Sequence, residues 1–210
     1  MKKSNAPHAR QRILDAAVAV FSEKGFDGAR VDQISQKASV PKSLIYYHFK
    51  SKDEILSVLM EDFINEYEFL IRQPMENGPV DYSPESLGRR IQDNYSAFIE
   101  KNADLLRIAF IESLKKTTEK PYVFRIAEMI VRQDDIDPEA NSFSERMMGE
   151  FFTGIVPILA FVCFQPAWEK SYSLSPDDMK HIFADLLSVS HGAYHRELLK
   201  DEDSDENKGE

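Results

Sequence analysis

The chain has 210 residues, enough for one large domain or two small ones, and its single cysteine, Cys163, excludes an intrachain disulfide and fits a reducing compartment such as the cytoplasm. The formal net charge of −10 is unevenly spread, because residues 1–60 hold ten Lys/Arg and six Asp/Glu, a balance of +4, while residues 61–210 carry −14. This asymmetry indicates a small nucleic-acid-binding end on an acidic body, although chance variation would also produce it.

Four helices are predicted before residue 72. Apolar residues spaced three and four apart predict an amphipathic helix over 10–24 that ends at Gly25. Short helices over 32–38 and 42–48 flank a tight turn, Ser39-Val40-Pro41. A capping box of Ser51 and Glu54 predicts the start of a fourth helix that runs to about residue 71. The inward positions of the first helix are Ile13, Leu14, Ala17, Val20 and Phe21.

The third of these helices carries large polar groups on the face that turns away from the core. With Ile45 inward, steps of about 100° per residue point Ser43, Tyr47 and Lys50 outward. Lysines and tyrosine hydroxyls suit phosphates, and ring faces suit sugars and thymine methyls. The two short helices and their turn therefore indicate a helix-turn-helix whose second helix enters the major groove. Alternatively, the tyrosines pack against a neighbouring helix.

The remainder of the chain is also predicted to be helical, over 84–101, 104–117, 121–133, 142–164 and 176–200, with a kink at Pro157. The longest apolar run, Phe151–Phe164, is too short to cross a bilayer, so we expect a buried core helix and no membrane partner. The fold class is all-α, with about nine helices. We expect an N-terminal DNA-binding domain over 1–52, a helical domain over 53–200 and a disordered acidic tail over 201–210.

The segment RQRILDAAVAVFSEKGFDGARVDQISQKASVPKSLIYYHFKSKDEIL resembles the DNA-binding domain of the tetracycline-repressor (TetR) family of bacterial transcription regulators. The run I-Y-Y-H-F-K-S-K-D-E-I-L is its most specific part. The chain departs from the usual pattern at Ala29 and Arg30, in the turn, and at Leu44, which leaves the operator sequence open. The resemblance and the outward face together predict DNA contacts at Arg30, Lys42, Ser43, Leu44, Tyr46, Tyr47, His48, Lys50 and Lys52; His48 is alternatively a partly buried capping residue.

The resemblance further implies a cytoplasmic homodimer that binds a palindromic double-stranded operator and, usually as a repressor, is released by a small molecule. Two C-terminal helices are expected to form the dimer interface, although their apolar stripes would also suit an ordinary monomer core. The candidate dimerisation residues are Phe152, Ile155, Leu159, Ile182, Phe183, Leu186, Leu187 and Ser190.

A largely apolar effector is expected among the middle helices, where aromatic and methionine side chains are frequent, although such stripes are more often plain core. The candidate effector residues are Tyr95, Phe98, Phe110, Phe124, Met129, Met147 and Phe151, and Arg107 and Glu112 are polar anchors or surface residues.

Other functions receive little support from the sequence. His191 and His195 are four apart, a spacing that can bind a metal, but no carboxylate or cysteine is placed by the sequence to complete a site, so no metal and no cofactor are predicted. We find no nucleophile elbow, phosphate-binding glycine loop or H-E-x-x-H, so we predict that the protein is not an enzyme. A helical interaction protein that binds no DNA is the remaining alternative.

Overall fold

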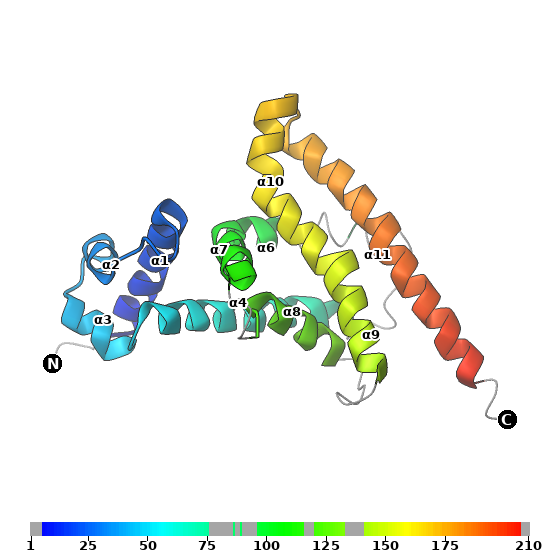
Figure 1. The fold of residues 1–210 in the computed structure, drawn as a ribbon, viewed down its shortest axis with the longest axis horizontal. Helices are drawn as coiled ribbons and strands as arrows, with labels where there is room; N and C mark the ends of the chain where they lie inside the picture. Colours follow the sequence, from blue (N-terminus) through cyan, green and yellow to red (C-terminus); the bar gives the residue numbers. More distant parts are fainter. Residues whose placement is uncertain are drawn as a thin grey trace. The chain divides into compact units, whose positions relative to one another are not determined.

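The computed structural model describes residues 6–75, 96–115, 120–132 and 141–206, together with Ser86 and Arg89. Every regular element in these ranges is a helix, which confirms the all-α class (Figure 1). The start of the helix predicted over 84–101 falls largely outside the described residues. The elements are α1 (Ala6–Lys24), α2 (Val31–Ala38), α3 (Lys42–His48), α4 (Lys52–Met75), α6 (Ser96–Lys101), α7 (Ala103–Lys115), α8 (Tyr122–Val131), α9 (Asn141–Gly149), η3 (Glu150–Ile155), α10 (Val156–Tyr172) and α11 (Pro176–Glu206).

Two compact units make up the chain. Unit 1 comprises Met1–Glu66 and Asn102–Tyr122, and unit 2 comprises Tyr67–Lys101 and Val123–Glu210. Unit 1 therefore combines the N-terminal helices with α7, which the sequence had assigned to the C-terminal domain. The predicted boundary between a DNA-binding domain and a C-terminal domain after residue 52 stays a prediction. The two units reflect which residues pack together and not what each residue does.

The core of unit 1 follows the predicted periodicity. All five inward positions of α1 are buried, as are Ile34 and Ala38 of α2 and Ile55 and Leu56 of α4. Full burial of an aliphatic side chain contributes about 1.5–3 kcal/mol, so these positions supply much of the unit's stability.

The packing of α7 against α1 is reinforced by a charged bridge. Lys115 Nζ lies 2.8 Å from Asp27 Oδ2, in the turn after α1, and 2.6 Å from the buried Glu112 Oε1. Glu112 is thereby a structural partner within unit 1, and Arg107 pairs with Asp104, so neither supports the role of an effector anchor.

The boundaries of the N-terminal helices have local causes. Gly25 follows α1 with φ +70°, a left-handed conformation that glycine adopts without strain. Ser39 follows α2 with φ 53°, a conformation that costs a residue with a Cβ about 1–2 kcal/mol. At the start of α4, Ser51 Oγ accepts the backbone N–H of Glu54 at 3.1 Å, while the Glu54 carboxylate accepts the N–H of Lys50.

Unit 2 contains one long helical stretch, α9–η3–α10, whose centre is a π-helical segment. The backbone N–H of Val156 donates to Phe151 O, five residues back, directly before Pro157, which has no N–H to donate. The irregularity predicted for Pro157 thus takes the form of a π-turn. By length and composition the stretch 142–172 is long enough to cross a membrane, so the apolar helix is longer than the sequence indicated.

Two C-terminal boundaries also differ from prediction. α10 does not end at residue 164 but continues through Pro166 to Tyr172, where Ser173 adopts φ 55°. Pro166 has no N–H to donate within the helix. α10 packs along α11 one turn earlier, where Phe161 stacks on Phe183 with ring centroids 4.2 Å apart. α11 in turn continues to Glu206, so the tail predicted to be disordered from residue 201 is helical over its first residues.

Candidate nucleic-acid interface

The turn between α2 and α3 is held by backbone and hydroxyl hydrogen bonds. The N–H groups of Ser39 and Val40 donate to Gln36 O and Ser35 O at 3.2 and 3.1 Å. Ser35 Oγ donates to Val40 O at 2.6 Å. These bonds satisfy the end of α2 and direct the chain into α3, which gives the two helices the short connection of a helix-turn-helix.

The orientation of α3 is set by two buried side chains, Ile45 and Phe49. Its opposite side is exposed, with Tyr46 at 56% and Tyr47 at 78% of their full accessible area. Leu44 is half-buried between the two sides. We call the exposed set of Lys42, Ser43, Tyr46, Tyr47 and Lys50 the α3 surface.

The chemistry of the α3 surface suits a polyanion with apolar ring faces. It offers two ammonium groups and three hydroxyl groups as donors to phosphate oxygens, and two aromatic rings that can lie against sugars or bases. Lys42 forms an ion pair with Asp32 of α2. Exposed ion pairs are worth less than about 1 kcal/mol, so a phosphate can readily replace Asp32 as the partner of Lys42.

His48 is less available than its neighbours. Its ring is half-buried, with its centroid 5.1 Å from that of Tyr47 and 6.1 Å from that of Phe49. Its Nε2 is shielded from solvent and has no hydrogen-bond partner among the described residues. This placement agrees with the alternative prediction that His48 is partly buried. Its ring packs against one side of the Tyr47 ring.

Lys52 has a structural position and not the expected phosphate-facing one. Its Nζ donates to the carbonyl oxygens of Phe26, Asp27 and Ala29 at 2.7, 3.2 and 3.4 Å and lies 4.6 Å from the centroid of the Phe26 ring. An ammonium has three N–H donors, and all three have partners here. Lys52 therefore fastens the start of α4 to the turn after α1, an interaction between residues 23–26 positions apart that no local pattern indicates.

Arg30 begins α2 without a hydroxyl cap. Its backbone N–H donates to Gln33 Oε1 at 2.9 Å, so Gln33 supplies half of a capping box. The Arg30 side chain is exposed and remains available to a phosphate.

The predicted effector residues are divided between the units. In unit 2, Phe98 stacks on Tyr67 at 5.7 Å, Phe151 meets Phe124 edge to face at 5.0 Å, and Met129 and Met147 are half-buried. Phe110 belongs to α7 and hence to unit 1. Tyr95 lies outside the described residues.

The predicted dimerisation residues also separate into two groups. Ile155, Leu159 and Leu187 are buried inside unit 2 itself, because both helices use these positions for the subunit core. Phe152, Ile182, Leu186 and Ser190 are exposed, and Phe183 is half-buried against Phe161. Only the exposed group is available to a partner.

A groove of about 320 Å³ runs between α10 and α11 and has almost entirely apolar walls. Four of its lining side chains are large, apolar and at least half exposed: Phe164, Trp168, Ile182 and Leu186. We call these four residues the α10–α11 face. Trp168 lies beyond the predicted end of the helix at residue 164, and Phe164 was expected to be buried in the core but is 60% exposed.

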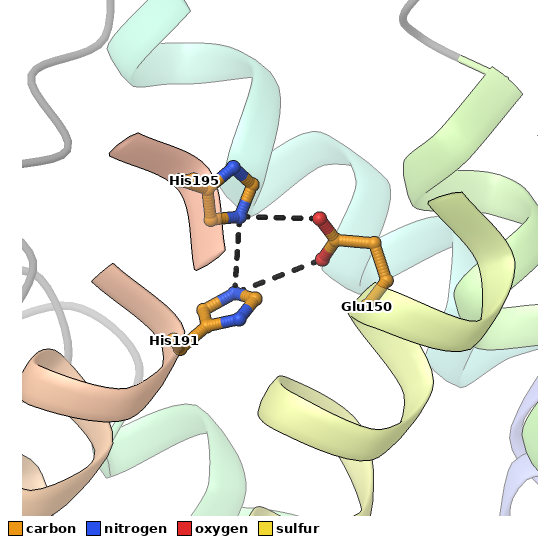
Figure 2. Close-up of side chains that lie close together, drawn as sticks. All are labelled: Glu150, His191 and His195. Carbon is orange, nitrogen blue, oxygen red and sulfur yellow. Dashed lines mark hydrogen bonds and ion pairs between the residues drawn. The ribbon is translucent and has the colours of Figure 1, made fainter. Parts of the chain in front are cut away.

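A buried polar cluster lies elsewhere in unit 2. Glu150 of η3 points toward His191 and His195 of α11, and the three side chains converge (Figure 2). Glu150 is 4% exposed. The Glu150 carboxyl group is the potential third ligand that the sequence did not indicate, since it lies 41 residues before His191.

Comparison with known proteins reveals similarity in the N-terminal segment. Residues 13–59 match the family model described as "Bacterial regulatory proteins, tetR family". The biofilm operon icaADBC HTH-type negative transcriptional regulator IcaR of Staphylococcus epidermidis is 37% identical over 73 residues, 34% of this chain and 40% of that protein. The HTH-type transcriptional repressor DhaR of Mycobacterium sp. (strain GP1) is 31% identical over 91 residues, 43% of each chain. The chain thus spans less than half the length of these relatives.

Solved structures resemble the chain over most of its length. The transcriptional regulator FadR from Bacillus subtilis, in complex with stearoyl-CoA, superposes with a TM-score of 0.56 at 18% identity, covering 85% of this chain and 97% of that chain. A TetR-like transcriptional regulator from Rhodococcus sp. RHA1 gives 0.51 at 18% identity, with 85% and 93% covered. At these identities the likeness concerns the fold alone.

Proposed function

We propose that this chain is a member of the tetracycline-repressor (TetR) family of bacterial regulatory proteins, whose model matches residues 13–59, and that it is a dimeric transcription repressor. It binds a palindromic operator through α3 and releases it when a small molecule binds in unit 2. The relatives it resembles are transcription regulators, which are not enzymes, and the protein acts in the cytoplasm, where the chromosome lies.

The observation that carries this proposal is the exposure of Tyr46 and Tyr47 beside Lys42 and Lys50 on the second helix of a helix-turn-helix. In the complex, α3 lies in the major groove, with Ser43 and Leu44 toward base edges. The tyrosine hydroxyls, the lysines and Arg30 contact phosphates, which position the helix without reading sequence. His48 supports Tyr47 from behind.

Dimerisation is required because one helix reads too few base pairs to be specific. Two-fold symmetric regulators place their recognition helices about one DNA turn, or a multiple of it, apart. We expect a second copy of this chain to bind to the α10–α11 face. Its exposed side chains are apolar and aromatic, and they come from two neighbouring helices that run in opposite directions (Figure 1). Pairing this face with itself across a two-fold axis gives a four-helix interface.

The effector is expected to be largely apolar and to contact Phe98, Phe124, Met129, Met147 and Phe151 in unit 2. FadR shares the fold and binds stearoyl-CoA, so the fold can accommodate a long apolar chain. A ligand releases DNA only if it binds the released conformer more tightly than the DNA-bound one. α4 has residues in both units and is the element through which we expect the change to pass.

Fluorescence anisotropy with DNA from upstream of the protein's own gene tests this function. We expect saturable binding that exceeds binding to unrelated DNA and weakens steeply with salt, because phosphate contacts release counterions. Tyr47→Ala should lower the affinity by about tenfold to a hundredfold, and the same change at Tyr172, another exposed tyrosine, in α10, should leave it unchanged. Equal affinity for genomic and random fragments, with protein refolded to remove bound ligand, would refute the proposal.

A further inference from the structure

Three potential metal ligands converge between η3 and α11 (Figure 2). His195 Nε2 lies 3.1 Å from Glu150 Oε1 and 3.2 Å from His191 Nε2, and His191 Nε2 lies 3.7 Å from Glu150 Oε2. Glu150 is buried, and both histidines are mostly buried. Three donor atoms from two helices thus face one point inside unit 2.

The orientation of His191 is determined by Thr153. Thr153 Oγ1 donates its one hydrogen to Gly149 O at 2.7 Å, so it accepts at 2.8 Å from His191 Nδ1. The proton of the neutral imidazole is therefore on Nδ1, and the lone pair of Nε2 points toward His195 and Glu150. A hydrogen bond to the far ring nitrogen is the usual way in which proteins orient a metal-binding histidine.

The close approach of the two helices depends on a small residue. A Cβ on Gly154 would lie 3.0 Å from His191 Cε1 and 3.2 Å from its Nε2. The glycine lets η3 come near enough to α11 for Glu150 to reach both rings.

Glu150 contributes a carboxyl group that is 4% exposed and lies directly beside the rings of His191 and His195. A buried carboxylate with two imidazoles can be neutralised either by a proton shared among the three groups or by a cation.

The spacing of the donor atoms matches that of a first-row metal site. Zinc lies about 2.0–2.1 Å from nitrogen and oxygen ligands, so two ligands of a tetrahedral site are about 3.3 Å apart. Here His195 Nε2 lies 3.1 Å from Glu150 Oε1 and 3.2 Å from His191 Nε2, and one ligand atom from each of the three residues lies within 4.8 Å of the other two. Two imidazoles with one carboxylate suit Zn²⁺, Fe²⁺, Co²⁺ or Ni²⁺, whereas Mg²⁺ and Ca²⁺ prefer oxygen ligands alone.

We propose that Glu150, His191 and His195 bind one divalent transition-metal ion per chain, with zinc-like preference and a coordination position left open. The cation lies between the Glu150 carboxyl group and the two imidazole rings. It links η3 to α11 and so stabilises the helix pair that carries the α10–α11 face. Thr153 is a positioning residue, since it acts through His191. Metal binding in this form does not depend on whether the protein binds DNA.

The test uses the full chain without a polyhistidine tag, stripped with chelator and titrated with Co²⁺. We expect visible d–d absorption that saturates at one ion per chain, is abolished by Zn²⁺, and is accompanied by a higher Tm. Glu150→Gln and His195→Ala should each weaken binding by about 100-fold or more. Thr153→Val should weaken it by about tenfold, with recovery in Thr153→Ser.

His181→Ala is the matched control, because His181 is an exposed histidine on the same helix. It should retain wild-type Co²⁺ affinity, and circular dichroism will establish that each variant is folded. Equal Co²⁺ binding by wild type and folded His195→Ala, or no saturable binding by wild type, would refute the proposal and identify the cluster as a hydrogen-bonded core group.

Discussion

The two units expose aromatic side chains with different chemistry. The α3 surface presents Tyr46 and Tyr47, whose hydroxyl groups lie beside lysines, whereas the α10–α11 face presents Phe164 and Trp168 among aliphatic residues. A tyrosine can remain hydrated at its tip and donate to a phosphate, but a phenylalanine or leucine gains free energy only when water is removed. Exposed aromatic residues therefore do not identify a partner by themselves; their neighbours do.

The largest expected effect comes from a charge on the α10–α11 face. Leu186 is 64% exposed, so Leu186→Glu should leave the subunit folded but raise the dimer dissociation constant about 1,000-fold, roughly 4 kcal/mol. Sedimentation equilibrium measures the change. Leu114→Glu, which alters an equally exposed leucine of unit 1, should leave association unchanged. An unchanged dimer dissociation constant for Leu186→Glu would mean that the α10–α11 face is not the dimer interface and binds another partner.

Lys52 and Lys50 lie two residues apart but differ in their contacts, since the Lys52 ammonium donates to backbone carbonyl oxygens and the Lys50 side chain is exposed and proposed to contact DNA. Lys52→Met removes the donors of three carbonyl oxygens and should lower the free energy of unfolding by about 2–3 kcal/mol. Urea denaturation of Lys50→Met provides the control, and this exposed change should stay within about 0.5 kcal/mol of wild type. Similar stabilities for the two variants would contradict the role given to Lys52.

Lys50→Gln should act on DNA binding and not on folding. We expect the operator affinity to fall about fivefold and the slope of log K against log salt to decrease by about 0.9, the value for one phosphate contact. Anisotropy at several salt concentrations measures both. Lys101→Gln, at an exposed lysine of unit 2, should leave the slope unchanged. A comparable loss of slope in the two variants would show that the α3 surface has no special role.

The smallest expected effect concerns the turn that holds α3. Ser39 has φ 53°, so Ser39→Gly relieves backbone strain and should stabilise the protein by about 0.5–1 kcal/mol. Ser43→Gly, in the first turn of α3, should instead destabilise the protein, by less than about 1 kcal/mol. Thermal unfolding of both variants gives the two signs, and a destabilising Ser39→Gly would be inconsistent with the conformation of the turn.

The N-terminal elements could be predicted because their signals are local. Helical periodicity identified the buried side of α1, Gly25 marked its end, and Ser51 marked the start of α4, so the exposure of Tyr47 followed from a single inward residue, Ile45. Each of these features depends on contacts within a few residues or on one amphipathic stripe.

Other features could not be predicted because they depend on tertiary contacts. Lys52 is occupied by carbonyl groups of a distant turn, and its sequence neighbourhood is that of any surface lysine. α10 continues through Pro166, a residue that usually ends or kinks a helix, and it packs on α11 through Phe161 and Phe183. Glu150 meets the histidines only because η3 and α11 approach closely, which no spacing along the chain reveals.

The π-turn of η3 has a consequence for sequence change in this part of the chain. A π-turn is equivalent to one residue inserted into an α-helix, and each residue corresponds to a rotation of about 100°. Removal of one residue between Glu150 and Ile155 would restore an ordinary α-helix. It would also rotate α10 by about 100° relative to Glu150. Phe164 and Trp168 would then rotate out of line with the carboxylate. The orientation of the α10–α11 face relative to the buried cluster therefore depends on the number of residues in η3. A one-residue deletion in η3 should disturb both sites at once, and so harm the protein more than most single substitutions there.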